Sequence, residues 1–199
     1  MIFLADTSED LATVADELKA GVGQLLTPLT RRAYAGGIYA IDNGAFSQFD
    51  RDRFLAIVER QRPFADKCLF VTVPDVIGSA RRTSEVFEYW ADRIQGFPLA
   101  YAVQDGIEDI SIPWKTIRAV FIGGTTAFKL SDQARQVIAA AKLMGKWVHI
   151  GRVNNPERWD RFAALGADSC DGTGISRYSH MRERVARGLP LQEIMKAEQ

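Results

Sequence analysis

The chain has 199 residues, of which 47% are hydrophobic and 25% are charged, and its 25 basic residues balance 25 acidic ones. This size and composition fit one globular domain with a substantial core. A net charge of zero exerts no general attraction on a polyanion, so any contact with nucleic acid has to come from a local patch. Such a patch could form, unless these side chains are simply exposed helix faces, from Arg31 and Arg32, Arg81 and Arg82, or the late series Arg177, Arg182, Arg184 and Arg187.

The few cysteines and histidines exclude two classes of small protein. Cys68 and Cys170 imply no disulfide framework, and together with His149 and His180 they lack the paired spacing of a structural zinc site, so we expect no structural metal.

No apolar run approaches the roughly 20 residues of a membrane helix. The first residues also lack the basic region and apolar segment of a signal peptide. We therefore expect a cytoplasmic protein that makes no membrane contact.

Short apolar runs rich in β-branched and aromatic residues predict eight buried strands. The second and the eighth are the weakest of the series. In chain order the runs are 2–5, 24–28, 38–41, 69–73, 99–103, 119–122, 147–150 and 169–170.

Amphipathic segments with helix-start signals separate most of these runs. Apolar side chains at helical spacing follow each signal, and the signals are Thr7-Ser8-Glu9-Asp10, Asp50, Ser79, Ser131 and Asn155-Pro156-Glu157. The segment 107–118 contains Pro113 and predicts no more than a turn or two of helix. This alternation predicts a single compact (β/α)8 barrel over residues 1–199. An open doubly wound sheet is the alternative, because the two weakest strands could be loops.

Polar and glycine residues follow nearly every predicted strand. In a (β/α)8 barrel the catalytic groups lie at the C-terminal ends of the strands, so these residues would converge on one rim. Turn formation explains any one of them, but turns do not require polar groups at almost every loop of one face. The residues are Asp42 to Phe46, Asp75, Gln104 with Asp105, Gly123 with Gly124, Gly151 with Arg152, and Asp171.

These residue types suit a flat heterocycle attached to a sugar. Two carboxylates can serve as nucleophile and as acid or base at an anomeric carbon. A further aspartate can accept N–H bonds from a purine edge, and a glutamine amide can both donate and accept. Gly123 and Gly124 would let a flat ligand approach the backbone, and Arg177 could hold a phosphate.

The strand-end motifs resemble, in order from Ile38 to Arg177, those of the queuine tRNA-ribosyltransferase (tRNA-guanine transglycosylase) family. Asp42-Asn43-Gly44-Ala45-Phe46 is similar to the family's Asp-Ser-Gly-Gly-Phe. The remaining similar segments are Val73-Pro74-Asp75, Val103-Gln104-Asp105-Gly106 (family Val-Gln-Gly-Gly), Ile122-Gly123-Gly124 (family Ile-Gly-Gly) and Asp168-Ser169-Cys170-Asp171 (family Asp-x-x-Asp), with Arg177 six residues further on.

The resemblance implies a barrel enzyme that replaces guanine in a polynucleotide with a 7-deazaguanine, such as 7-cyano-7-deazaguanine, without breaking the backbone. It implies Asp171 as the nucleophile and Asp42 as the acid–base group. Asp75, Gln104 and the backbone at Gly123 and Gly124 would hold the base. It implies no cofactor, and a helper protein is a possible partner.

Departures from the family pattern indicate which polymer, DNA or tRNA, is the substrate. The family's cysteine-rich zinc subdomain is missing, the loops are short, and Asn43 and Ala45 replace a serine and a glycine of the motif. These differences favour the compact phage relatives that modify DNA, which would act in the host cytoplasm, over the tRNA enzymes. DNA is therefore the expected polymer, and tRNA is the alternative.

Two other functions compete with base exchange. The glycines after the sixth and seventh strands suit a sugar-phosphate isomerase, lyase or aldolase, but Lys129 lies several residues beyond a strand end and fits poorly as its catalytic lysine. A non-catalytic module that binds nucleic acid or a free deazaguanine is the second rival.

Further side chains near the motifs have simpler structural explanations. One aromatic ring could stack on a purine, although core packing is the simpler role for each of Phe46, Tyr101, Phe128 and Tyr178. We expect His149 to be a hydrogen-bonded core residue, His180 to lie on a helix surface, and Cys170 to be a small buried side chain.

Overall fold

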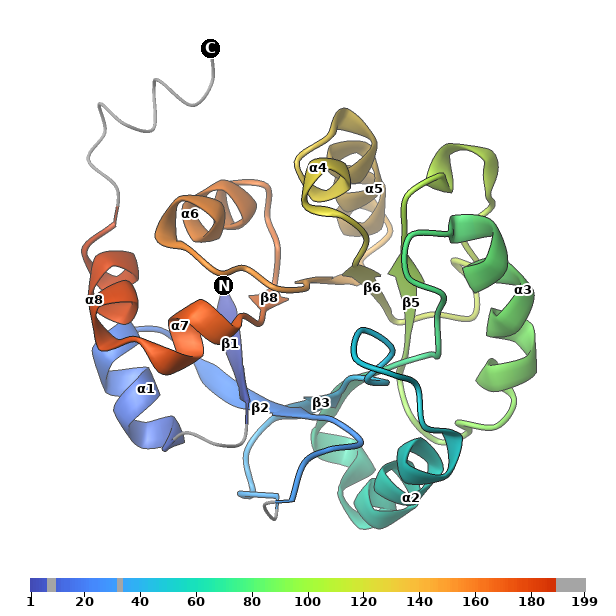
Figure 1. Ribbon diagram of the computed structural model, residues 1–199, viewed down its shortest axis with the longest axis horizontal. Helices are drawn as coiled ribbons and strands as arrows, with labels where there is room; N and C mark the ends of the chain where they lie inside the picture. Colours follow the sequence, from blue (N-terminus) through green and yellow to red (C-terminus); the bar gives the residue numbers. More distant parts are fainter. Residues whose placement is uncertain (7–9, 32–33, 189–199) are drawn as a thin grey trace.

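A computed structural model of the protein describes residues 1–6, 10–31 and 34–188 and contains one closed barrel of eight parallel strands (Figure 1). Each strand pairs with its neighbours in the sequence, and β1 pairs with β8 to close the ring. The strands are β1 Ile2–Asp6, β2 Val22–Leu26, β3 Tyr39–Ile41, β4 Cys68–Thr72, β5 Leu99–Val103, β6 Ala119–Ile122, β7 Trp147–Ile150 and β8 Ser169–Cys170.

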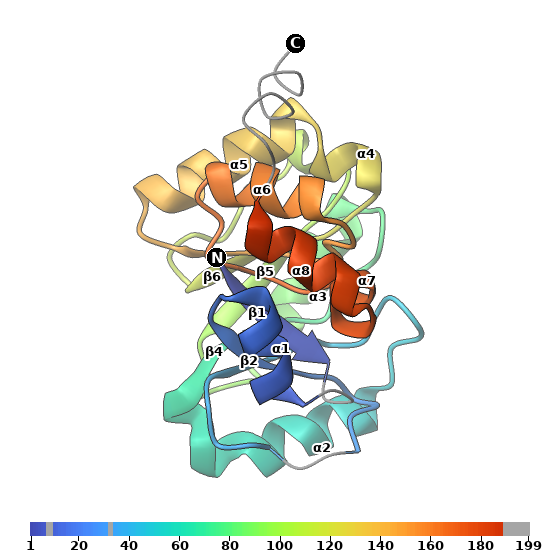
Figure 2. The same ribbon diagram turned by 90° about the vertical axis from the view of Figure 1, so that its left-hand side faces the viewer.

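Helices surround the barrel, as the views along and across it show (Figures 1 and 2). The connection between β2 and β3 has no helix in its described residues, and the connection between β5 and β6 has only the short 3-10 helix η2. The helices are α1 Leu11–Leu18, α2 Arg51–Gln61, η1 Arg62–Lys67, α3 Ala80–Ala91, η2 Ile107–Asp109, α4 Thr126–Lys129, α5 Asp132–Leu143, α6 Pro156–Ala164, α7 Thr173–Arg177 and α8 Ser179–Arg187.

The predicted (β/α)8 barrel is confirmed, and the open sheet is excluded by the pairing of β1 with β8. The second strand begins two residues before the predicted 24–28 run, because it includes Gly23. A Cβ at Gly23 would lie 2.8 Å from the carbonyl oxygen of Ile38, so only glycine fits between these strands. A search for apolar runs leaves such a glycine out of the strand.

The predicted helix starts are real caps where the structure describes them. Asp10 accepts the backbone N–H of Ala12, whereas Thr7, Ser8 and Glu9 lie outside the described residues. The other four caps each accept the N–H three residues further on, and they are Asp50, Ser79, Ser131 and Asn155.

Alternation along the strands divides the core into two layers. One set of side chains points into the barrel and combines three alanines with larger leucine and phenylalanine side chains, which together fill the confined interior: Leu4, Leu25, Ala40, Phe70, Ala100 and Ala119. The intervening residues point outward and pack against the helices, where Phe54 and Trp90 meet edge to face. Complete burial of such a side chain contributes about 1.5–3 kcal/mol.

Three of the four arginines of the predicted late patch take part in ion pairs. Arg182 is buried and pairs with Glu17, which joins α8 to α1 beside the β1–β8 seam. Arg184 pairs with Glu157, and Arg187 lies 3.9 Å from Glu183. The predicted late patch is therefore reduced to Arg177, while Arg32 of the first candidate pair lies outside the described residues.

Two further findings concern membrane-spanning helices and metal-binding side chains. In the described part of the chain, no helix is long and apolar enough to cross a membrane. No group of three or more His, Cys, Asp or Glu side chains among the same residues could hold a metal ion.

Candidate active site

Strand alternation aims several polar side chains into the open C-terminal end of the barrel. Asp42 and Asp171 follow the inward-facing Ala40 and Ser169 by two residues, and Asp6 follows Leu4 in the same way. Because side chains two apart point to the same side of a strand, these carboxylates face the barrel axis. The short β3 and β8 end before their aspartates, which therefore lie at the mouth.

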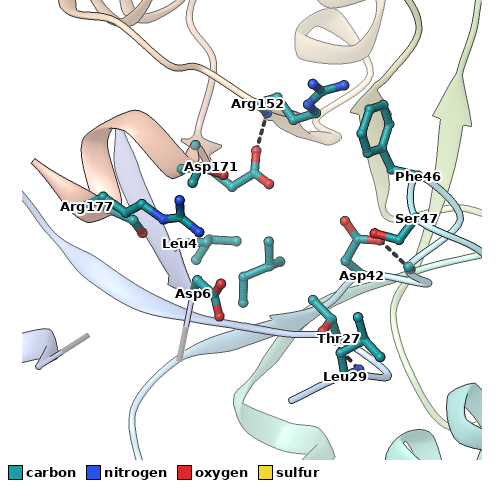
Figure 3. A pocket seen from close by; sticks show the side chains of 15 residues that line it. Leu4, Asp6, Thr27, Leu29, Asp42, Phe46, Ser47, Arg152, Asp171 and Arg177 are labelled. Atoms are coloured by element: carbon teal, nitrogen blue, oxygen red, sulfur yellow. Dashed lines mark hydrogen bonds between the residues drawn. The ribbon is translucent and has the colours of Figure 1, made fainter. Parts of the chain in front are cut away.

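These side chains line a cavity of about 330 Å³, here called the open pocket (Figure 3). The side chains of Asp42 and Asp171 approach it from opposite sides, and Arg177 lies beside Asp6 at its edge (Figure 3). Its lining also includes Thr27, Leu29, Phe46, Ser47, Arg152 and Ser176. The structure thus brings together four predicted site residues, namely Asp42, Asp171, Phe46 and Arg177.

Asp171 is held in place by the backbone that follows β7. The Arg152 N–H donates to its Oδ1, and only 15% of its side chain is exposed. Burial, together with the charge of Asp42, raises the pKa of Asp171 to about 6, against lowering by the Arg152 N–H bond and by the cations of Lys129 and Arg152. The carboxyl group is therefore largely ionised at neutral pH but can take up a proton just below it.

Asp42 is held by the turn that follows β3. Its Oδ1 accepts the Gly44 N–H at 2.8 Å, and burial raises the pKa of its carboxyl group despite this bond. Two carboxyl groups that interact in a shared pocket favour one ionised and one protonated member. This pair can therefore supply a nucleophile and an acid at the same pH.

A second, smaller cavity of about 50 Å³, here called the inner pocket, adjoins the open pocket and shares Asp42, Phe46, Arg152 and Asp171 with it. It contains the remaining predicted site residues, Asp75, Gln104, Gly123 and Gly124. Its volume is far below the roughly 300–1,000 Å³ of a typical small-ligand cleft.

The polar groups of the inner pocket are bonded to one another. Asn43 donates to Asp75 Oδ1 at 2.8 Å and to the Val73 carbonyl at 3.0 Å, and Gln104 Nε2 donates to Asp75 Oδ2. The Gly78 N–H donates to Gln104 Oε1 at 3.0 Å. Burial raises the pKa of Asp75 to about 6, with Asp42 adding to the rise and the Asn43 and Gln104 bonds opposing it. Asn43, which differs from the family motif, thus positions Asp75.

The two glycines after β6 have a packing role as well as a proposed binding role. A Cβ at Gly123 would lie 2.8 Å from Gln104 Nε2. Gly124 has a φ of +72°, and a Cβ there would lie 2.5 Å from Asp105. Asp105 in turn accepts hydrogen bonds from the N–H and the hydroxyl of Thr125, at 2.9 and 2.7 Å. Thr125 is the residue that caps the start of α4.

A stacked pair covers the inner pocket. The Arg152 guanidinium lies 3.7 Å from the centre of the Phe46 ring, which is 61% exposed. Arg152 has a φ of 62°, a left-handed backbone that a non-glycine residue rarely adopts. Of the four aromatic residues considered for stacking, Tyr101 and Phe128 are buried in the core and Tyr178 packs on His180, so Phe46 alone lines the pockets.

Lys129 is a site residue that the sequence pattern did not identify. Lys129 is the last residue of the short helix α4, which follows β6, and it lines the inner pocket although it lies six residues after Gly123. Its Nζ donates to the Gly151 carbonyl at 2.6 Å. Burial lowers the pKa of Lys129 to about 8, against the opposing effect of Asp171. Lys129 therefore lines the pocket although it lies several residues beyond the end of β6.

His149 lies inside the barrel beneath the site. Trp147 Nε1, which can only donate, bonds Ser169 Oγ at 2.8 Å, and Ser169 Oγ lies 2.9 Å from His149 Nδ1. The other ring nitrogen of His149, Nε2, lies 4.0 Å from Asp171 Oδ1. Burial lowers the pKa of His149 to about 3. Cys170 is buried and His180 is exposed on α8, as predicted.

Comparison with known proteins shows the fold class. No protein-family model matches the chain, and no curated protein matches it. Phosphoribosyl anthranilate isomerase from Thermus thermophilus is similar over 94% of this chain and 96% of its own, with 15% identity and a TM-score of 0.50.

Two larger barrels are also similar. A mandelate oxidase variant with 2-hydroxy-phenylacetamide matches 94% of this chain and 72% of its own at 14% identity and a TM-score of 0.57. A flavocytochrome b2 variant matches 99% of this chain and 63% of its own at 15% identity and a TM-score of 0.55. At such low identity these likenesses show a shared barrel and nothing about the reaction.

Proposed function

We propose that this protein is a base-exchange glycosyltransferase that replaces guanine in a polynucleotide with a 7-deazaguanine. The observation that carries the proposal is the arrangement of Asp42 and Asp171. Both are buried carboxyl groups with raised pKa values, and both line the open pocket and the inner pocket. A nucleotide whose base enters the inner pocket would have its glycosidic bond between them.

The inner pocket has the hydrogen-bonding groups that a guanine edge requires. An ionised Asp75 accepts two N–H bonds, which matches the adjacent N1–H and N2–H donors of guanine. The Gln104 amide and the Gly124 N–H can donate to O6. For this, Gln104 and Asn43 have to release Asp75, and the stacked Phe46 and Arg152 have to part. A base in a duplex has to be extruded first, because stacking hides its glycosidic carbon.

The reaction consists of two displacements at C1′ of the target nucleotide. An Asp171 oxygen bonds C1′ as the C1′–N9 bond breaks, and guanine leaves with the electron pair and takes a proton from Asp42. The incoming 7-deazaguanine then gives its N9 proton to Asp42, and N9 displaces Asp171 from C1′. Two inversions give net retention, and the phosphodiester backbone stays intact.

DNA is the proposed polymer, in keeping with the short loops around the barrel mouth, and tRNA is the alternative. Arg177 is the predicted phosphate contact, at the edge of the open pocket. With most of the late arginines engaged in ion pairs, binding of the polymer would rest on few contacts or on a helper protein.

One incubation series tests this proposal. Purified protein is mixed with guanine-containing DNA or with tRNA, together with 7-cyano-7-deazaguanine, and digested polymers are analysed for nucleosides by mass spectrometry. We expect the deazaguanine nucleoside in DNA with the wild-type protein and none with Asp171→Ala. Product in tRNA alone would replace DNA as the polymer. Product formed equally well by Asp171→Ala would eliminate the proposed nucleophile.

Lys129 keeps a second candidate function open, a sugar-phosphate lyase or aldolase. A buried lysine with a pKa lowered to about 8 can form a Schiff base with a carbonyl substrate. Borohydride reduction in the presence of small keto acids or sugar phosphates would then attach the substrate covalently to the wild-type protein but not to Lys129→Met. Absence of an adduct with these carbonyl compounds would favour base exchange.

A further inference from the structure

A third cavity, of about 220 Å³ and here called the cationic pocket, opens between the ends of β6 and β7. It shares Phe46, Ile77, Gly124, Lys129 and Arg152 with the inner pocket, so it continues that pocket outward. Its own lining adds two threonine hydroxyls, an asparagine and a third cation, namely Thr125, Thr126, Asn154 and Arg158.

The charges around the cationic pocket are unbalanced. Lys129, Arg152 and Arg158 line it, and no Asp or Glu belongs to its lining. Within the described residues, none of these three cations has a carboxylate oxygen within 4.0 Å of its charged nitrogens. The nearest acidic influences on Lys129 are Asp171 and Asp105, and Asp105 is already bonded to Thr125.

Lys129 also has spare hydrogen-bonding capacity. Its ammonium group has three protons, and Gly151 is its one hydrogen-bond acceptor in the described part of the chain. The side chain is 9% exposed. A buried cation without a counter-ion is costly, so a ligand that offers an acceptor or a negative charge here is stabilised, whereas a cationic ligand is repelled.

The order of groups around the barrel indicates which part of a base would reach this pocket. Around the edge of guanine run N2, N1, O6, position 7, C8 and N9. Asp75 after β4 matches the N1 and N2 donors, Gln104 and Gly124 after β5 and β6 match O6, and Asp171 after β8 must meet the sugar at N9. Position 7 then falls between β6 and β8, where the cationic pocket opens.

We propose that the cationic pocket receives the substituent at position 7 of the incoming base and selects a neutral or anionic hydrogen-bond acceptor there over an amine. The suitable chemical class includes a nitrile, a carboxamide and a carboxylate, and the disfavoured class is a protonated aminomethyl group. This inference rests on the proposed base exchange and specifies which deazaguanine takes part in it.

The test uses bases that share the 7-deazaguanine ring and differ at position 7. Exchange of labelled guanine into guanine-containing DNA and tRNA is measured first, because guanine has no substituent for the pocket to select. Incorporation of the 7-cyano, 7-carboxy and 7-aminomethyl bases is then compared by kcat/KM. Because like charges in a buried site repel strongly, we expect the aminomethyl base to be worse than the cyano base by about tenfold to a hundredfold.

Substitutions in the pocket make the test specific. Lys129→Met keeps the length of the side chain without its charge, and Arg158→Glu reverses a charge at the rim. Each should reduce the preference for cyano over aminomethyl by about threefold to tenfold. Arg81→Met on the exposed face of α3 is the matched control and should leave the preference unchanged. Thermal melting shows whether Lys129→Met folds. If that variant does not fold, the preference measured with Arg158→Glu is the test.

The outcomes separate this inference from the proposed function. Guanine exchange together with equal use of the aminomethyl and cyano bases would overturn the inference and leave base exchange intact. A preference for cyano that survives both substitutions would place the selection elsewhere and also overturn it. Absence of guanine exchange with either polymer would remove the proposed function, and the inference with it.

Discussion

The open pocket and the inner pocket lie side by side at one end of the barrel, but they differ in free volume and in how far their polar groups bond one another. The open pocket has about 330 Å³ of space, and its carboxylates Asp42 and Asp171 already face that space. The inner pocket has about 50 Å³, and its polar groups bond one another under the stacked Phe46 and Arg152. The proposed catalytic pair is thus preformed, whereas the proposed base site has to be opened by its ligand.

This difference has a consequence for selectivity. A base that enters the inner pocket exchanges existing hydrogen bonds for new ones, so the net gain in affinity from each bond is small. A ligand that lacks a matching donor or acceptor leaves buried Asp75 or Gln104 unsatisfied, which is heavily penalised. We therefore expect the inner pocket to contribute discrimination between bases more than tight binding.

The largest effect should follow from removing the carboxylate of the inner pocket. Asp75→Asn keeps the shape but replaces one acceptor oxygen with a donor that faces other donors. We expect kcat/KM for base exchange to fall about 100-fold or more. Asp109→Asn, on the exposed helix η2, is the control. Wild-type kinetics in Asp75→Asn would show that this pocket does not hold the base.

The pH dependence of exchange should report the buried carboxyl groups. Burial raises the pKa of Asp171 to about 6, so the nucleophile is ionised above this pH and protonated below it. We expect kcat/KM to fall about tenfold for each pH unit well below 6, where Asp171 is increasingly protonated.

Asp75 titrates in the same range, with a pKa of about 6. Calorimetric binding of the free base depends on Asp75 without the chemical step, so it separates the two groups. A rate that is flat from pH 5 to pH 8 would contradict an ionised nucleophile at this position.

Asp171 should lower the stability of the fold at neutral pH. Its pKa is about 6 in the folded protein against the ordinary 3.8, so the folded state binds the proton more tightly. Wild-type stability therefore falls as the pH rises from about 4 to about 6. At one pKa unit per 1.36 kcal/mol, Asp171→Asn should be more stable by about 1–3 kcal/mol at pH 7.5.

Urea unfolding at several pH values measures this difference. The gain from Asp171→Asn should shrink toward zero as the pH falls below the ordinary pKa of 3.8, where the wild-type carboxyl group becomes protonated in both states. A gain that is independent of pH would mean that the aspartate charge is not its cause.

The smallest effect concerns the cover of the inner pocket. Arg152→Gly removes the left-handed strain and the stacked guanidinium but keeps the backbone N–H that holds Asp171. These changes oppose each other, so we expect stability to change by less than about 1 kcal/mol. Exchange should slow about threefold to tenfold, because Asp171 loses a nearby cation.

The matched control is Lys19→Gly at the end of α1, where the other non-glycine residue with a positive φ in the described chain relieves similar strain away from the pockets. It should stabilise the protein without changing exchange. Equal exchange rates in Arg152→Gly and Lys19→Gly would assign Arg152 a structural role only.

The barrel and the ring of strand-end residues could be predicted from the sequence because both depend on local signals. Apolar runs mark the strands, Asp50, Ser79, Ser131 and Asn155 mark helix starts, and the residue after each run lies at the barrel mouth. The start of β2 was missed because Gly23 carries no apolar signal, although its backbone contact with Ile38 requires glycine.

The rest of the site depends on contacts between distant residues. Lys129 lines the inner pocket from the end of α4, where it donates to the Gly151 carbonyl after β7, and Asn43 bonds Asp75 from a different strand-end loop. Arg152 could be placed after β7, but its stacking on Phe46 could not, since nothing local links residues so far apart. The roles of Asp42 and Asp171 remain predictions that exchange measurements will test.

Closure of the barrel depends on the last strand to be synthesised, because β8 pairs with β1. Asp171 follows a two-residue strand that is held by β7 on one side and by β1, from the opposite end of the chain, on the other. A nascent chain that still lacks its last strand has neither a closed barrel nor an aspartate opposite Asp42. We therefore expect incomplete or truncated products to be inactive in the proposed base exchange rather than partly active.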